Sequence, residues 1–384
     1  MASLSNSTRL LILGYGIFLV GLFYNPNQVD HYKVYYIAVL LPTLFVLSRA
    51  YGNVHLSPLF WLCIAYICYT LLSSFWSMDF SWVGFLRHCF YSILVVSFIF
   101  ATAVVREYSE IQFVILKKIL VIAAALAAVF SILLWYVIEG HPFPDSRLIG
   151  MGRMLNENLT GMAYGLVAII GAHLFIQETR RQAAILWGIS FILLASLVLL
   201  TQSRSAIGAM LIAVLILTFN RGGLVLLFLV SLAGIALYLN DTLLAHLLSG
   251  VQSRLYIWQS VIDLIKDKPW FGYGVLSDST VSTPIGDFVH AHSIYLATLR
   301  DGGVVGGVIF FSMLAVAIRT ALRIAARSSH RLLLSLLVFG MLSMVADIDR
   351  LIIRPTEIWL IFWFPLALII TDKSRINKPL PQYG

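Results

Sequence analysis

Residues 287–311 read DFVHAHSIYLATLRDGGVVGGVIFF and pass from two histidines, an Arg-Asp pair and four glycines directly into an apolar run. The apolar part continues to Ile318, so the segment 292–318 is long enough to be a membrane helix. The N-terminal end of this segment carries many hydrogen-bonding groups, and a helix that contacts only lipid does not need them. The sequence therefore predicts a polar site at one end of a membrane helix.

The composition of the whole chain also predicts a membrane protein. Its 384 residues are enough for two or three soluble domains, but 60% of them are apolar and only 11% are charged. The mean hydropathy is +0.91, which is typical of a polytopic membrane protein. The net charge of +8 would suggest nucleic acid as the partner of a soluble protein. Here orientation in the membrane explains most of that charge, and no nucleic-acid partner is expected.

About twelve segments are candidates for spanning helices, because a helix needs about 20 apolar residues to cross the hydrocarbon layer. The sequence thus predicts an all-α polytopic protein with a single membrane domain over residues 1–384. The first segment follows Arg9 without a cleavage site and is interpreted as an uncleaved span. The candidates lie near residues 9–24, 33–50, 57–75, 83–104, 117–138, 158–177, 183–201, 205–219, 222–239, 292–318, 331–347 and 355–371.

The distribution of Lys and Arg predicts how the chain lies in the membrane. With the N-terminus inside, these residues are more frequent in the inner loops and tails than in the outer ones, as the positive-inside rule requires. One long connection, residues 240–291, then lies on the outer face, and loops of such length are usually functional. The three cysteines fall in apolar segments and predict neither a disulfide nor a metal pair: Cys63, Cys68 and Cys89.

Within this loop, SRLYIWQSVIDLIKDKP (residues 253–269) has helical periodicity. We expect the loop to contain short amphipathic helices, and this stretch should form one that lies in the interface or against the bundle. Arg254 should begin it at the centre of the apolar side, where its charge opposes the helix dipole. A nearby anion would resolve this conflict, and snorkelling to water is the alternative. The apolar side should consist of Leu255, Trp258, Val261, Ile262 and Ile265.

A second arginine, Arg204, occupies the short outer turn TQSRSA at residues 201–206, and the same alternative applies to it. Arginine presents a planar fork of donors and stays charged at any biological pH, which suits bidentate binding of a diphosphate. Two such arginines near one outer loop therefore predict a site for a lipid diphosphate of the outer leaflet.

The quoted stretch supplies a candidate base. If a helix begins at His292, then Leu299, Gly303 and Gly306 follow on nearly the same side, while His290 points the opposite way. The glycines would let another helix or an acyl chain approach closely, although RDGG could equally kink the helix. A helix-capping histidine is the ordinary alternative. A neutral imidazole at the outer surface can accept a proton from an attacking hydroxyl.

These residues resemble the O-antigen ligase and polymerase-like superfamily, whose ligases carry His-[Asn/Ser/Gln]-x9-Gly-x-x-Gly at the outer start of a late span. TQSRSA is similar to the family's Ser-Arg segment, and SRLYIWQSVIDLIKDKPWFGYG is similar to its Arg-x-x-x-Trp helix followed by Pro and Gly-x-Gly. The resemblance covers roughly residues 150–310. The histidine-glycine motif is matched without a gap by His292, Ser293, Gly303 and Gly306.

The resemblance implies an inverting, metal-independent glycosyltransferase of the bacterial inner membrane with a periplasmic active site and no cofactor. Such an enzyme transfers O-antigen polysaccharide from undecaprenyl diphosphate to a sugar hydroxyl of lipid A–core, a step of lipopolysaccharide biosynthesis. Its partners are the lipid-linked donor, the lipid A–core acceptor and membrane lipid. Arg204 and Arg254 would hold the diphosphate and His292 would be the base. The sequence contains no His-Glu-x-x-His helix and no cysteine cluster.

Four further residues are candidates for supporting roles. Arg147, Arg153 and Asn158, in the outer segment 139–158, resemble the family's Arg-x-x-Gly and Asn-containing segment, although GRMLNENLTG departs from the commoner Pro-Asn form. Structural and sugar-contacting roles are both open for these three residues. Arg300, beside the glycines, is the fourth candidate.

The stretch DIDR at residues 347–350 offers two carboxylates. Asp-x-Asp coordinates metal-bound nucleotide sugars in other glycosyltransferases, but this copy lies at the outer end of a span, where nucleotide sugars are not expected. Asp347 or Asp349 is instead expected to pair with Arg350 or Arg354, to orient His292, or to bind acceptor sugar.

Three other functions remain open. A polysaccharide polymerase would use the same lipid-linked donor, and a protein O-oligosaccharyltransferase would differ in its acceptor. One histidine motif and one long outer loop favour the ligase. A transporter would also have about twelve spans, but the sequence has neither internal symmetry nor paired broken helices.

Overall fold

The computed structural model of the chain describes residues 6–50, 56–108, 110–143, 145–154, 156–219, 241–328 and 331–372. Two short strands, β1 (Val281–Thr283) and β2 (Gly286–Phe288), pair antiparallel in a hairpin. The α-helices are α1 (Asn6–Tyr24), α2 (Gln28–Val34), α3 (Leu41–Ala50), α4 (Pro58–Ser73), α5 (Trp82–Tyr108), α6 (Glu110–Ile132), α7 (Glu157–Gln177), α8 (Arg181–Leu200), α9 (Arg204–Thr218), α11 (Asp241–Asp267), α12 (Ile294–Ser328), α13 (Leu332–Ser343) and α14 (Phe364–Ile370). Short π and 3-10 turns extend several of them: η1 (Tyr35–Leu40), η3 (Ser74–Trp76), η4 (Leu133–Ile138), η5 (Met344–Ala346) and η6 (Trp359–Trp363).

The helices agree with the prediction of an all-α polytopic membrane protein, apart from the small hairpin. Seven of the described helices are long and apolar enough to cross a membrane, and three more apolar helices are shorter. The predicted span 222–239 lies outside the described residues. Every other predicted span coincides with a helix, while the total number of spans stays a prediction. The shorter apolar helices are Arg204–Thr218, Leu332–Ala346 and Trp359–Ile370.

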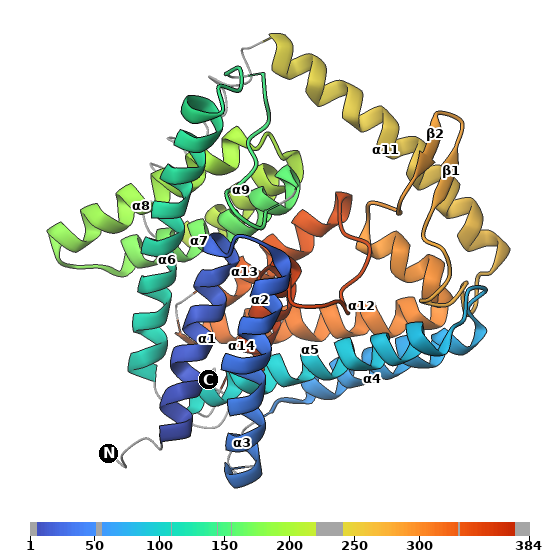
Figure 1. Ribbon diagram of the computed structural model, residues 1–384, viewed down its shortest axis with the longest axis horizontal. Helices are drawn as coiled ribbons and strands as arrows, with labels where there is room; N and C mark the ends of the chain where they lie inside the picture. The colour runs from blue at the N-terminus through green and yellow to red at the C-terminus, as the bar shows by residue number, and fades with distance from the viewer. Residues whose placement is uncertain are drawn as a thin grey trace, which may run out of the picture.

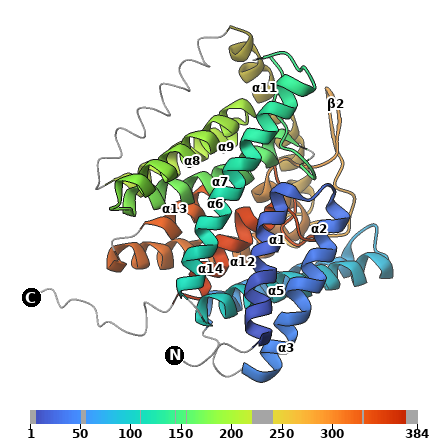
Figure 2. The ribbon, with the colours of Figure 1, turned by 60° about the vertical axis from the view of Figure 1, so that its left-hand side comes forward.

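The helices pack in groups that surround a common core (Figures 1 and 2). Helix α1 lies beside the continuous run of α2, η1 and α3, whereas α4 packs along α12. Helices α7, α8, α9 and α13 form another layer. Trp359 joins the first group to the C-terminal helices, because its ring lies 5.0 Å from that of Tyr35 and 5.1 Å from that of Phe98. These large rings fix the relative positions of α1, α5 and the C-terminal segment by close packing.

Helix α11 departs from the bundle and arches over one side of it (Figure 1). Its 27 residues span about 40 Å at the helical rise, so the long loop contains one extended helix where short helices were expected. Its start at Asp241 also makes the prediction for Arg254 wrong, since Arg254 lies inside the helix and does not oppose its N-terminal dipole.

Only part of the predicted apolar side of α11 packs on the rest of the protein. Leu255 and Ile262 are 58% and 39% exposed, so they lie outside that contact, and their expected place in the interface stays a prediction. The contact with β1 and the start of α12 is a small core in which Trp258 and Ile265 are partly buried. Arg254 shares this side, one helical turn before it. The buried residues of this core are Ile257, Val261, Val281, Ala291 and Ala297.

Helix α12 is broken at Gly303, as RDGG allowed. Gly303 has φ 61° and ψ −163°, and this break frees backbone groups that a continuous helix would use itself. The N–H groups of Val304 and Val305 donate to the carbonyls of Pro269 (2.7 Å) and Trp270 (3.2 Å). A Cβ at Gly303 would lie 2.3 Å from the Trp270 carbonyl carbon, so the break and the turn require a glycine.

The turn after α11 also donates backbone hydrogen bonds to α12. The N–H groups of Tyr273 and Gly274 donate to the carbonyls of Arg300 (2.9 Å) and Asp301 (2.8 Å). Gly274 has φ +86°, a left-handed conformation that glycine adopts without strain. The Gly-x-Gly turn and the Gly-x-x-Gly helix are therefore the two halves of one backbone interlock, which fixes the end of α11 to α12.

Candidate active site

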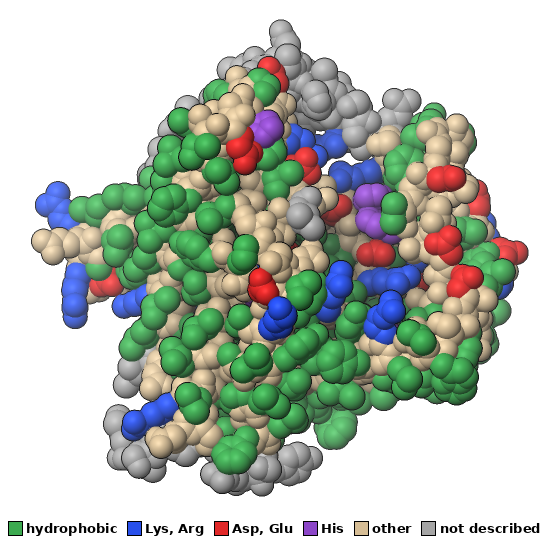
Figure 3. Space-filling model, viewed as in Figure 1, with side chains coloured by type: hydrophobic (Ala, Val, Ile, Leu, Met, Phe, Trp, Pro, Cys, Tyr) green, Lys and Arg blue, Asp and Glu red, His purple; other side chains and the backbone are tan. Residues whose placement is uncertain are grey.

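Charged side chains and histidines gather on the face beneath α11 (Figure 3). Arginines, histidines and carboxylates surround a hollow there, between α11 and the bundle, and apolar side chains cover much of the surrounding surface. The hollow brings together residues far apart in the chain, from the segment after η4 to the segment after α13.

Arg147 is held in this region by contacts on both sides of its guanidinium. Its Nε donates to the carbonyl of Thr201 (3.0 Å), and an Nη donates to the side-chain oxygen of Asn158 (2.6 Å). Glu157 lies 4.0 Å away. Asn158 therefore positions Arg147, and Thr201 ties it to the turn that carries Arg204.

Arg204 and Arg254 come close to each other, as the sequence predicted. Arg204, the first residue of α9, is within electrostatic range of Arg254 and Arg147. Partial burial is the main cause that lowers the pKa of Arg254; the carboxylate of Asp347 opposes this and Arg147 adds to it. Three guanidinium groups thus share a site with the carboxylates of Glu157 and Asp347. Such an excess of positive charge favours a bound anion.

His292, in the segment before α12, is linked to this arginine cluster through Asp347, whose carboxylate is within electrostatic range of Arg254. Its Nδ1 lies 3.5 Å from Oδ1 of Asp347, and the Asp347 side chain is only 7% exposed. An acid on one ring nitrogen favours the tautomer whose other nitrogen accepts a proton. Of the two acids in DIDR, the structure thus brings Asp347 to His292, whereas Asp349 lies 3.8 Å from Arg350.

The predicted helix start at His292 is wrong. Helix α12 begins at Ile294, and His292 precedes it in a left-handed conformation with φ 47°. His290 does not point the opposite way either, because its ring centroid lies 4.0 Å from that of His292. Ser293 is buried, and its carbonyl accepts the first N–H of the helix from Ala297 (2.8 Å).

Arg153 lies in the protein interior. Its side chain is fully buried and forms an ion pair of 3.1 Å with Glu357, which is also buried. Its backbone N–H donates to the carbonyl of Asn25 (2.9 Å). Arg153 therefore joins the segment between η4 and α7 to the start of the C-terminal helices, and its ion pair is with Glu357 instead of with the arginine cluster's carboxylates.

Arg300 and the glycines of the motif form the support beneath the site. Arg300 is buried, with its Nε 2.7 Å from Asp301 and an Nη donating to the carbonyl of Ser279 (2.9 Å). A Cβ at Gly306 would lie 2.7 Å from the Tyr69 ring, whose hydroxyl donates to the Gly302 carbonyl (2.5 Å). Gly303 and Gly306 thus hold α12 against the turn and against α4.

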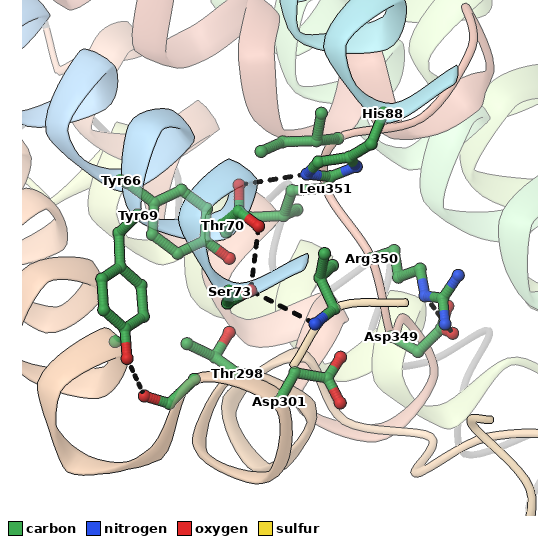
Figure 4. A pocket seen from close by; sticks show the side chains of 14 residues that line it. Tyr66, Tyr69, Thr70, Ser73, His88, Thr298, Asp301, Asp349, Arg350 and Leu351 are labelled. Atoms are coloured by element: carbon green, nitrogen blue, oxygen red, sulfur yellow. Dashed lines mark hydrogen bonds and ion pairs between the residues drawn. The ribbon is translucent and has the colours of Figure 1, made fainter. Parts of the chain in front are cut away.

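A polar pocket lies on the other side of the DIDR segment (Figure 4). Asp301 and Thr298 of α12 face Thr70 and Ser73 of α4 across it, and His88 donates to or accepts from Thr70 at 3.2 Å. Its lining also includes Asp349 and Arg350. The pocket therefore places polar side chains of α4, α12 and the DIDR segment together inside the bundle.

Several contacts of the site were not predicted from sequence. The predicted site residues did not include Glu157, Asp301, Glu357 or His290, and Asp347 was not singled out from Asp349. Pairing of carboxylates with arginines more than 200 positions away, as for Glu357 and Arg153, leaves no local pattern. The adjacent Arg300-Asp301 pair was visible in the sequence, and its apolar setting was the available signal for an internal ion pair.

The apolar helices and the cationic hollow define a multi-pass membrane protein with a site suited to an anionic substrate. Residues 189–311 match the family described as O-Antigen ligase. The matched segment contains the two arginines, the histidine and both glycines of the predicted site: Arg204, Arg254, His292, Gly303 and Gly306.

A full-length relative gives the same result. The chain is 26% identical over 374 residues to a Pseudomonas aeruginosa PAO1 protein named O-antigen ligase, and the match covers 94% of this chain and 90% of the relative. The resemblance to the O-antigen ligase superfamily, predicted from the sequence, is thereby confirmed. These two matches support an enzyme of the glycosyltransferase type.

Proposed function

We propose that the chain transfers O-antigen polysaccharide from undecaprenyl diphosphate to a sugar hydroxyl of lipid A–core, on the periplasmic side of the inner membrane. The observation that supports this proposal is the His292–Asp347 pair, whose carboxylate lies within electrostatic range of Arg254, which in turn shares a site with Arg204 and Arg147. The site thus offers a base and an anion-binding surface within a membrane protein. Transfer of a glycan from a lipid diphosphate to a hydroxyl group requires both of these features.

In the proposed donor site, Arg204 and Arg254 bind the diphosphate, and Arg147 adds charge from the third side. The leaving diphosphate gains negative charge as its bond to the anomeric carbon breaks. Preorganised donors stabilise that charge in the transition state, and loss of one such donor typically costs about 100-fold or more in rate. The anchoring of Arg147 by Asn158 and Thr201 provides such preorganisation.

In the proposed acceptor step, the acceptor hydroxyl attacks the anomeric carbon from the face opposite the diphosphate. Its proton passes to Nε2 of His292, while Asp347 holds Nδ1–H and stabilises the imidazolium. A new carbon–oxygen bond forms, the bond to the diphosphate breaks, and the configuration inverts. The proton then returns to water from the partly exposed His292 ring. Such general-base catalysis contributes about 100- to 10,000-fold.

Reconstitution in vesicles tests this proposal. The purified protein receives a lipid-linked glycan and either lipid A–core or a second molecule of lipid-linked glycan, with and without a chelator. We expect glycosylated lipid A–core, unaffected by chelation. Elongated lipid-linked glycan alone would identify a polymerase, and loss of product with chelator would contradict metal independence.

The His292→Ala variant tests the base in the same assay. We expect a protein that still inserts in the membrane but makes no long-chain product on lipid A–core. Normal product from this variant would refute the role of His292. Donor binding by a double Arg204→Ala, Arg254→Ala variant at wild-type affinity would refute the diphosphate site independently.

A further inference from the structure

The backbone of His292 has to be held in place by its surroundings. Its φ of 47° is uncommon for a residue with a side chain and persists only where neighbouring contacts determine it. The residue lies between β2 and α12, outside any regular element. Its position therefore depends on side-chain contacts.

His290 supplies those contacts. Its Nδ1 accepts the backbone N–H of His292 at 3.2 Å. The two imidazole rings lie 4.0 Å apart between centroids with 46° between their planes, and Phe288 meets the His292 ring edge-on at 6.4 Å. His290 thus contacts both the backbone and the ring of His292, while Asp347 contacts the ring from another side.

We propose that His290 is a positioning residue for transfer: its neutral imidazole accepts the His292 N–H and packs on its ring, which aims His292 at the acceptor hydroxyl. This inference rests on the proposed role of His292 as base. His290 lies outside the histidine-glycine motif and acts through His292, without contact to substrate. Its bond to the N–H two positions along the chain has the form that Asn and Asp side chains adopt in Asx-turns.

The charge state of His290 has to leave Nδ1 unprotonated. Burial is the main cause that lowers the pKa of His290; the carboxylates of Asp349 and Asp347 oppose this, and the charges of His292 and Arg300 add to it. The net direction is downward, so the imidazole stays neutral at neutral pH and loses its acceptor only as the pH falls below the usual histidine range. The ionisable groups that face it are those four residues.

Three substitutions separate the two contacts that His290 makes. His290→Asn keeps an acceptor two positions before the His292 N–H, as in an Asx-turn. His290→Phe keeps a ring but has no acceptor, and His290→Leu has neither. The matched control is His141→Leu, because His141 also stacks on an aromatic ring, that of Trp135 at 3.8 Å, in another part of the chain.

The experiment measures kcat, and KM for the lipid-linked donor, in the reconstituted assay with lipid A–core. We expect His290→Leu and His290→Phe to lower kcat by up to about 100-fold, the loss typical of a misplaced catalytic group. KM should be unchanged, since the arginines remain. His290→Asn should recover most of kcat, and His141→Leu should match the wild type. The temperature of unfolding of each variant shows that the protein is folded.

Three results would overturn the inference. Wild-type kcat in His290→Leu would show that His292 needs no such support, and equal loss in the Asn and Leu variants would exclude the acceptor role. Transfer by His292→Asn together with none by His290→Asn would assign the base to His290 instead. Failure of the wild type to glycosylate lipid A–core would refute the proposed function. That failure is distinguishable from failure of the inference about His290, because the inference is tested only by comparing variants with an active wild type.

Discussion

Arg153 and Arg254 show how the surroundings of an arginine decide what it does. Both follow apolar or small residues in segments predicted to lie outside the membrane. The Arg153 side chain is fully buried and its charge is matched by Glu357 at 3.1 Å. Arg254 is only partly buried and lies with Arg204 and Arg147, where the three guanidinium groups outnumber the carboxylates of Asp347 and Glu157. The charge of Arg153 is thus matched inside the protein, whereas the cluster is proposed to bind an anion.

Removing the carboxylate of Glu357 should destabilise the fold. In Glu357→Gln the buried guanidinium of Arg153 loses its counter-charge, which typically costs about 3 kcal/mol or more. We expect a lower unfolding temperature in detergent, measured by fluorescence. A double Arg153→Met, Glu357→Leu variant removes both charges and should recover most of the loss.

The double variant also distinguishes the two roles that were open for Arg153. Wild-type transfer activity in a protein without this arginine is expected if its role is structural. A stable double variant that fails to transfer would show instead that Arg153 contacts sugar.

Replacing Arg254 with lysine should impair transfer even though the charge is kept. Lysine carries a point charge without the planar fork, so bidentate contact with a diphosphate is lost. We expect Arg254→Lys to reduce kcat/KM for the donor by about 100-fold. The control is Lys266→Ala on the exposed face of the same helix, where Lys266 pairs with Asp263 at 2.8 Å. If Arg254→Lys and Lys266→Ala were both as active as the wild type, the proposed diphosphate site would be contradicted.

Helix α12 depends on a single residue at its break. Gly303→Ala would place a methyl group 2.3 Å from the Trp270 carbonyl carbon and 2.5 Å from the Phe271 nitrogen. These are backbone atoms that cannot move aside without loss of the interlock, and alanine also resists φ 61° by about 1 kcal/mol or more. We expect a lower unfolding temperature and little transfer.

Gly208→Ala is the matched control for this substitution. Gly208 lies within α9, and a Cβ added there meets nothing within 4 Å. Alanine is the better helix former by about 1 kcal/mol, so stability should be unchanged or slightly higher. An unfolding temperature for Gly303→Ala as high as that of Gly208→Ala would refute the interlock.

The sequence predicted most elements because apolar segments of membrane length have few alternatives. It also predicted that Arg204, Arg254 and His292 meet, since each lies at the end of a helix or in the long loop. It did not predict the start of α11 at Asp241, because that start depends on residues ahead of the periodic stretch. It also did not predict the exposure of Leu255, because the position of the neighbouring hairpin determines which side of α11 is covered. The break in α12 was open, since two adjacent glycines permit a kink without requiring one. The pairing of His292 with Asp347 depends on the end of α13, 55 positions away.

For the molecule as a whole, orientation in the membrane is the property on which the proposed function depends. The donor and acceptor are expected in the periplasmic leaflet, so the hollow has to face that side. The distribution of Lys and Arg predicts this orientation, and single-cysteine labelling tests it.

The labelling experiment replaces the three native cysteines, Cys63, Cys68 and Cys89, with alanine. Asp287→Cys, near the hairpin, and Arg319→Cys, towards the far end of α12, then each provide one exposed thiol. We expect a membrane-impermeant maleimide to label the first in intact spheroplasts and the second only after lysis. The reverse pattern would place the hollow in the cytoplasm and contradict the proposed function.

The interlock between residues 269–274 and 300–305 is made by backbone atoms, apart from the need for glycine. Any relative that keeps these glycines can form the same bonds, whatever side chains it carries between them. Residues 275–287, which end before Phe288 and His290, could therefore be exchanged with those of a relative as a cassette while α11 stays anchored to α12. If that segment contributes to the choice of sugar, chimeras joined at these two borders would change the glycan accepted without rebuilding the catalytic scaffold.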